Sequence, residues 1–163
     1  MKTDDNLKKN FSAEAMASIR YSAYAEIAEK DGYRQIAKLF RTMSEVEKVH
    51  AINTLKISGE IGNTSENLTS AIDSKTYEFT QWYPTLIEQA DLDARPIAST
   101  TFQGAADTSK THVVLLTEAL ENIGRNKETD YWVCNVCGYV NPGDMPVSCK
   151  ICGASREKFV QID

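Results

Sequence analysis

The sequence is poor in the residues that most often carry chemistry. Only four cysteines and two histidines occur among 163 residues, and acidic residues outnumber basic ones by 23 to 18. A surplus of negative charge argues against a general nucleic-acid binder, because neutralising phosphates needs a basic surface. No run approaches the roughly 18 uncharged apolar residues of a membrane span, and the opening stretch MKTDDNLKKN has no apolar signal core. We therefore expect a cytoplasmic protein that binds neither nucleic acid nor membrane.

The cysteines are confined to the end of the chain. All four lie between Cys134 and Cys152, and the 133 residues before them contain none. Residues 131–163 carry three basic and three acidic side chains, so the preceding part holds the whole net charge of −5. A polar stretch at residues 125–130 follows Gly124 and is typical of a linker. The composition predicts two domains, residues 1–126 and 127–163.

Helical periodicity dominates the first 124 residues. We expect four amphipathic helices at about residues 10–30, 33–58, 65–91 and 95–123. Glycines that suit helix ends follow these stretches, at Gly32, Gly59 and Gly124. Pro84 falls inside the third stretch and should weaken or kink it. Four long helices joined mostly by short loops predict an antiparallel four-helix bundle.

The cysteines form two similar pairs, Cys134-Asn-Val-Cys137-Gly and Cys149-Lys-Ile-Cys152-Gly, separated by eleven residues. Two intervening residues let both thiolates of a pair face one ion, and the glycine allows a tight turn whose amides face sulfur. The pattern predicts a four-thiolate metal site. Two disulfides are the alternative, which a reducing compartment disfavours. Zinc and iron both suit four sulfurs, so the spacing leaves the metal open.

Ionisable side chains also occur on the apolar stripes of the expected helices, where they are costly unless paired or bound to metal. Glu47 and His50 stand at i and i+3 on the second helix. Glu14, Glu78 and His112 occupy the inward stripes of the first, third and fourth helices. A Glu-x-x-His pair facing further carboxylates inside a bundle is the arrangement of di-iron carboxylate proteins. The set predicts a metal site, and the alternative for any single member is a buried residue with an ordinary hydrogen-bond partner.

Short stretches in both regions carry a family resemblance. The tail resembles rubredoxin, in a short form, through Tyr131-x-x-Cys-x-x-Cys-Gly-Tyr139 and Cys-x-x-Cys-Gly-Ala154. The helical region adds Ala13-Glu14-Ala15, Arg20-Tyr21, Asp31-Gly32-Tyr33, Glu45-Val-Glu47-Lys-Val-His50, Asn67-Leu68, Tyr77-Glu78-Phe79, Trp82-Tyr83-Pro84 and Lys110-Thr-His112. With both regions together, nearly the whole chain resembles the rubrerythrin family.

The resemblance implies a ferritin-like, all-α four-helix bundle followed by a small β/loop rubredoxin-like domain. In that family two bundle irons reduce hydrogen peroxide, the rubredoxin site supplies the electrons, and an upstream reductase recharges it. A head-to-tail homodimer brings one subunit's tail near its partner's bundle. The implied ligands of the tail iron, for which zinc is the alternative, are Cys134, Cys137, Cys149 and Cys152. The implied bundle ligands are Glu14, Glu47, His50, Glu78 and His112. The implied catalytic residues are Glu14, Glu47, His50, Glu78 and Tyr21, with Tyr83 as a further hydrogen-bond partner.

Two positions depart from the family pattern. The third helix, normally Glu-x-x-Glu, reads Lys75-Thr-Tyr-Glu78, and the fourth, normally Glu-x-x-His, reads Ser109-Lys-Thr-His112. The losses fall mainly on the second iron, so we expect one bundle iron rather than two. Lys75 would stand in electrostatically for the second metal by pairing with Glu47 or Glu78. The alternative is that its amine reaches solvent.

A single bundle iron holds one electron at a time, whereas splitting peroxide into two waters takes two. We therefore expect peroxide reduction, as a defence against oxidative stress, to be weak or absent. Two other functions stay open. One is a non-catalytic electron carrier with a one-metal or empty bundle, and the other is a zinc-ribbon interaction protein.

Overall fold

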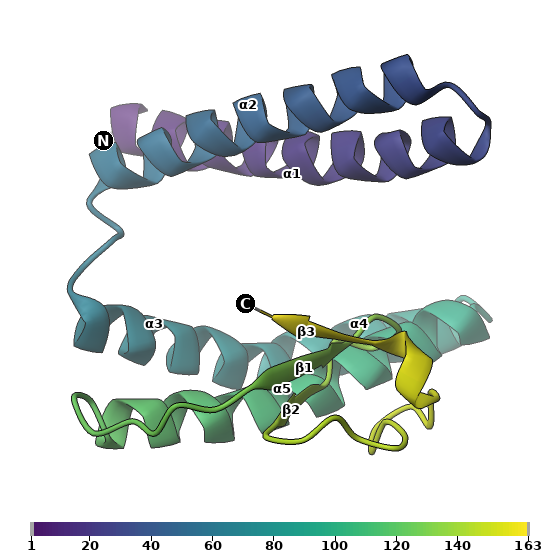
Figure 1. Ribbon diagram of the computed structural model, residues 1–163. Helices are drawn as coiled ribbons and strands as arrows, with labels where there is room; N and C mark the ends of the chain where they lie inside the picture. The colour runs from purple at the N-terminus through teal and green to yellow at the C-terminus, as the bar shows by residue number, and fades with distance from the viewer. Residues whose placement is uncertain (1, 163) are drawn as a thin grey trace. The chain divides into compact units, whose positions relative to one another are not determined.

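The computed structural model describes residues 2–162 and divides into two compact units, with the division between Gly62 and Asn63. The first unit is a hairpin of two antiparallel helices, α1 (Lys2–Lys30) and α2 (Arg34–Ser58) (Figure 1). Gly32 supplies the positive φ, 84°, that the turn between them requires. The helices bury small side chains: Ser18, Ala25 and Ala28 on α1, and Ala37, Ala51 and Thr54 on α2.

The second unit begins with a helix that is interrupted by a π-helical segment. α3 (Thr64–Tyr77) starts with a capping box in which Asn63 and Glu66 exchange hydrogen bonds. The π segment Glu78–Trp82, labelled η1, leads into α4 (Tyr83–Leu92), and the Tyr83 N–H donates to the Glu78 carbonyl. Pro84 is the physical cause, since it lacks an N–H and its ring clashes with the carbonyl four residues back. The kink expected at Pro84 therefore takes the form of a π segment.

α5 (Pro96–Glu121) and the cysteine module complete the second unit. The module is a three-stranded antiparallel sheet in the order β2-β1-β3. Its elements are β1 (Tyr131–Cys134), β2 (Val140–Pro142), the 3₁₀ turn Arg156–Lys158 labelled η2, and β3 (Phe159–Ile162). Tyr139, Phe159 and two of the cysteines, Cys134 and Cys149, form its buried core.

The module packs against α5. A Cβ placed on Gly104 would lie 3.9 Å from the Cβ of Cys137, and Thr111 and Leu115 face Tyr139 and Pro142 across a shallow hollow. This packing explains why the module shares a compact unit with α5, although the polar stretch at residues 125–130 intervenes in sequence.

The predicted fold class, mostly helical with a small C-terminal strand-and-loop module, is confirmed. The second and fourth expected helices match α2 and α5 within two residues at each end. The first begins earlier than expected, at Lys2, because its polar opening residues continue the helix. Within residues 2–162, no helix is long and apolar enough to cross a membrane.

Candidate metal centres

The four cysteines converge on one point. Sγ of Cys134 lies 3.8 Å from Sγ of Cys152, and Sγ of Cys137 lies 3.5 Å from Sγ of Cys149. All four sulfurs lie within 4.8 Å of one another. Ligands about 2.3 Å from a metal at the centre of a regular tetrahedron would lie about 3.8 Å apart. The cysteines are free thiols, so the arrangement fits a four-thiolate metal site and not two disulfides.

Backbone amides of the two knuckles face the sulfurs, as the glycine after each pair predicts. Burial opposes ionisation of the Cys149 thiol, but the N–H groups of Cys152 and Ile151 outweigh burial and lower its pKa to about 7. Burial raises the pKa of the Cys137 thiol, whereas the Tyr139 N–H, which donates to its sulfur, acts to lower that pKa. Gly138 adopts a φ of 81°, which closes the first knuckle. Such amides stabilise thiolates and tune a metal bound to them.

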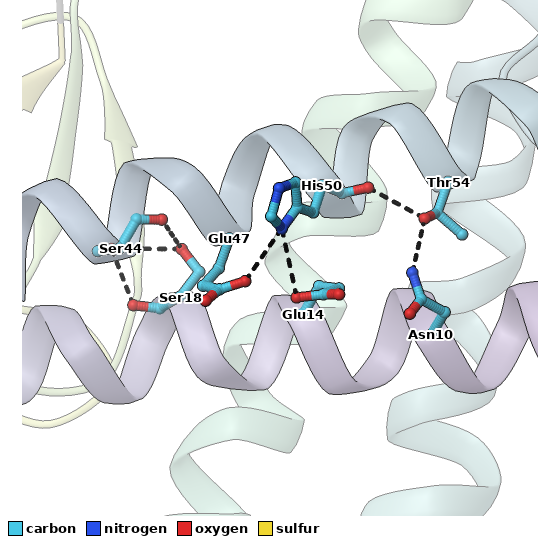
Figure 2. A network of polar contacts seen from close by, with 7 residues as sticks. All are labelled: Asn10, Glu14, Ser18, Ser44, Glu47, His50 and Thr54. Carbon is cyan, nitrogen blue, oxygen red and sulfur yellow. Dashed lines mark hydrogen bonds and ion pairs between the residues drawn. The ribbon is translucent and has the colours of Figure 1, made fainter.

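A second cluster joins the two helices of the hairpin. Glu14 on α1 and Glu47 and His50 on α2 each offer a ligand atom, and these atoms lie within 4.8 Å of one another. Nδ1 of His50 lies 3.3 Å from a Glu47 oxygen and 3.8 Å from a Glu14 oxygen (Figure 2). The carboxylates are mostly covered, with 24% and 19% of the Glu14 and Glu47 side chains exposed, whereas His50 is half exposed. Two carboxylates and an imidazole form a donor set that suits iron or zinc.

The two carboxyl groups crowd each other. The pKa of Glu14 is raised, first because its carboxyl shares a hydrogen bond with Glu47, then because of partial burial and repulsion by the Glu47 charge. The nearby His50 acts in the opposite direction without cancelling the shift. Crowded carboxylates of this kind hold a proton until a cation replaces it. The electrostatics therefore fit a bound metal ion.

Polar contacts on both sides of this cluster hold α1 and α2 in register. Ser18 and Ser44 exchange hydrogen bonds from each hydroxyl to the other's carbonyl, at 2.9 and 2.8 Å. Towards the other end, Asn10 donates to the Thr54 hydroxyl at 3.0 Å, and that hydroxyl donates to the His50 carbonyl (Figure 2). Sequence reasoning missed these four residues. Their signal is small polar side chains recurring on the stripes that carry Glu14 and His50.

Glu78 belongs to a different arrangement, inside the second unit. The Lys75 ammonium donates to both carboxylate oxygens of Glu78, at 2.9 and 2.8 Å, and the buried Ser109 hydroxyl donates to one of them at 2.9 Å. Lys75 is therefore not simply extended into solvent. Lys75 and Ser109, which stand where the family resemblance implies carboxylates, are the two residues that satisfy Glu78, and together they supply one positive charge and one neutral donor.

His112 contacts the cysteine module. Its Nε2 lies 3.0 Å from the carbonyl oxygen of Gly138, 26 residues along the chain. Tyr21 packs against Phe40 with ring centroids 6.2 Å apart, about two helical turns along α1 from Glu14, and Tyr83 begins α4. The structure thus brings Glu14, Glu47 and His50 together in one unit and places Glu78 and His112 in the other.

Comparisons with known proteins agree with this organisation. The family model described as Rubrerythrin matches residues 5–120, and the one described as Rubrerythrin, rubredoxin-like domain matches residues 132–160. Rubrerythrin-2 of Clostridium acetobutylicum is 31% identical over 96% of this chain and 95% of its own length. Nigerythrin of Nitratidesulfovibrio vulgaris is 26% identical over 96% of this chain and 85% of its own.

Solved structures give the same answer. The structure described as the partially reduced state of nigerythrin has a TM-score of 0.60 at 25% identity, covering 98% of this chain and 86% of that chain. One family model covers most of the helical region, a second covers the cysteine module, and relatives match over nearly their full length. The chain therefore belongs to the rubrerythrin family.

Proposed function

We propose that the protein is a rubrerythrin-like electron-transfer protein that reduces hydrogen peroxide slowly, using iron at the four cysteines and one metal ion at Glu14, Glu47 and His50. The observation that carries the proposal is the convergence of these three side chains, whose ligand atoms lie within 4.8 Å of one another. Iron, when bound, supplies reversible one-electron chemistry; the protein's part is to hold it, to orient its ligands and to limit its number.

The residues of the hairpin fix the donor set. Both carboxylates are mostly covered, and the Ser18–Ser44 contacts on one side and the Asn10–Thr54 contact on the other hold the helices that carry them. His50 presents a ring nitrogen to both carboxylates and is half exposed. That exposure leaves the site open to a small polar substrate such as hydrogen peroxide.

Lys75 and Ser109 engage the Glu78 carboxylate, which supports the proposal of a single bundle metal ion. They satisfy three acceptor positions of Glu78, and a further divalent cation at Glu78 would be repelled by the Lys75 ammonium. We propose that Glu78, which these two residues engage, and His112, which contacts the Gly138 carbonyl, lie outside the ligand set, in contrast to the family pattern. Two electrons and two protons convert peroxide into two waters, and a single iron would supply only one electron at a time, so we expect slow turnover.

The partners follow from this reaction. An upstream reductase supplies electrons to the cysteine site, and a second copy of the chain forms a homodimer of the kind that the family resemblance implies. Free thiols in a metal site suit a reducing compartment, which supports the proposal that the protein works in the cytoplasm.

The test is reductant-dependent peroxide consumption by the full-length, iron-loaded protein. We expect slow turnover that is lost in both Cys149→Ser and His50→Leu, since each removes one of the two sites. Exposed Glu26→Gln on α1 is the matched control and should keep the wild-type rate. Two bundle irons per chain, or a rate as high as that of relatives with all their carboxylates, would contradict the one-metal proposal.

The second candidate is a non-catalytic electron carrier, which the engagement of Glu78 by Lys75 and Ser109 favours. In that case the cysteine iron would cycle with the reductant, while His50→Leu would leave peroxide consumption at the background rate of the wild type. The same assay therefore separates the two functions.

A further inference from the structure

His112 links α5 to the first cysteine knuckle through a hydrogen bond. Nε2 lies 3.0 Å from the Gly138 carbonyl oxygen. A carbonyl oxygen can only accept, so Nε2 must carry the proton in this contact. The imidazole is therefore oriented with its Nε2–H toward a backbone group that directly follows Cys137 in the chain.

The peptide group that accepts this hydrogen bond also donates one. Its carbonyl belongs to Gly138 and its N–H to Tyr139, and the Tyr139 N–H faces the Cys137 sulfur. A hydrogen bond to the oxygen of a peptide group polarises it and strengthens donation by its N–H, because neighbouring hydrogen bonds reinforce one another. The contacts thus run from the imidazole, through one peptide group, to a thiolate of the metal site.

The knuckle is already held in place by its own backbone. The Gly138 N–H donates to the Cys134 carbonyl at 2.8 Å, and the Cys134 N–H donates to the Tyr139 carbonyl at 2.9 Å. Gly104 on α5 approaches the Cβ of Cys137 closely as well. Loss of the imidazole should therefore leave the position of the sulfur largely unchanged and alter mainly the strength of the amide donor.

We propose that His112 is a positioning residue for the four-cysteine site, which strengthens amide donation to the Cys137 thiolate and so favours the reduced state of iron bound there. Reduction adds one negative charge to a thiolate-bound iron, and donors to sulfur stabilise the more negative state. The proposal rests on the cysteine-bound iron of the proposed function but not on peroxide reduction. It gives the second histidine a role in electron transfer that differs from the bundle-ligand role implied by the family.

The test is the midpoint potential of the cysteine-bound iron in the full-length protein, followed by its visible absorption during a reductive titration. His112→Leu keeps most of the bulk and removes the donor, whereas His112→Gln keeps an N–H donor at a similar distance from the backbone. We expect leucine to lower the reduced-to-oxidised ratio at a fixed potential about threefold, close to 30 mV at 59 mV per tenfold change. Glutamine should restore at least half of the shift.

Two results would overturn the proposal. One is a leucine variant with the wild-type potential, and the other is equal shifts in the leucine and glutamine variants, which would mean that packing and not donation matters. A ¹⁵N NMR spectrum of the zinc-loaded protein adds an independent measurement, because it shows which ring nitrogen of His112 is protonated. A proton on Nε2 supports the contact, and an unprotonated Nε2 overturns it.

These measurements separate this inference from the proposed function. The potential and the tautomer do not depend on peroxide turnover, so a protein without peroxidase activity still tests His112. Conversely, wild-type potentials in the His112 variants would leave the results of the peroxide assay and its His50 and Cys149 variants unaffected.

Discussion

The two candidate metal centres are built in opposite ways. The four cysteines come from one short stretch of chain and are tied by backbone amides, and two of them, Cys134 and Cys149, lie in the core of a small sheet. Glu14, Glu47 and His50 come from two helices, and the histidine is half exposed. The first centre is organised by local backbone geometry and the second by helix packing. Metal binding at the cysteine site should therefore tolerate substitutions in the helices, whereas metal binding at the hairpin site should depend on each of its three ligands.

The largest effect should follow from removing a cysteine. Cys149→Ser takes away the thiol whose pKa the knuckle amides lower to about 7, and with it one of four ligands. We expect the metal content of the tail to fall from one ion per chain to nearly none, and the module to lose its fold, because structural metal binding contributes on the order of 10 kcal/mol. Metal analysis and near-ultraviolet circular dichroism measure both. A folded, metal-free module would show that its hydrophobic core suffices.

The next effect should come from His50→Leu. Removing one of three ligands should weaken iron binding in the hairpin at least tenfold, since even indirect partners of metal ligands are worth about 10- to 100-fold. Iron titration with the cysteine site already filled measures this affinity. His112→Leu is the matched control, because His112 bonds the module and not the cluster. Equal loss of hairpin iron in both variants would return His112 to the ligand set.

A smaller effect should follow from Lys75→Met. The substitution leaves the Glu78 carboxylate, with 21% of its side chain exposed, bonded to Ser109 alone. We expect a loss of about 1 kcal/mol in the free energy of unfolding, since the pair is partly screened by solvent. Urea unfolding measures it, and Lys75→Arg, which keeps the charge, is the control. A gain of a second bundle iron in Lys75→Met would support the view that the ammonium excludes it.

The smallest effect concerns pH. Because the pKa of Glu14 is raised above its ordinary value of 4.5 in the folded protein, the folded state holds this proton more tightly than the unfolded state. The stability it contributes is complete below about 4.5 and is lost as the pH rises through the raised pKa. In the metal-free protein, Glu14→Gln should therefore raise the melting temperature at neutral pH and flatten its decline above pH 4.5.

Metal binding at the hairpin cluster should reverse the effect of Glu14→Gln on the melting temperature. Iron bound at the hairpin cluster should raise the melting temperature of the wild type. It should have little effect on Glu14→Gln, which lacks one of the two carboxylate ligands. Wild-type and variant proteins with the same pH profile in the absence of metal would show that Glu14 and Glu47 do not share a proton.

Much of the fold could be predicted because its signals are local. Gly32 and Gly59 end helices, Pro84 disturbs one within a few residues, and the spacing of Cys134 and Cys137 by itself lets two sulfurs face one ion. Glu47 and His50 share a helix face for the same reason, since residues three apart on a helix are neighbours. Each of these features depends on backbone geometry over one or two turns.

The partners of the remaining residues could not be predicted from spacing. The helical periodicity places His112 and Lys75 on inward stripes, but it does not predict which groups of other elements contact them. Tertiary packing brings the Gly138 carbonyl to His112 and Ser109 to Glu78, across 26 and 31 residues of chain. The sequence alone determined the helices, the cysteine site and the family. Only the tertiary structure decided which polar groups Lys75, Glu78 and His112 contact, because a side chain's partners depend on long-range packing and not on its neighbours in sequence.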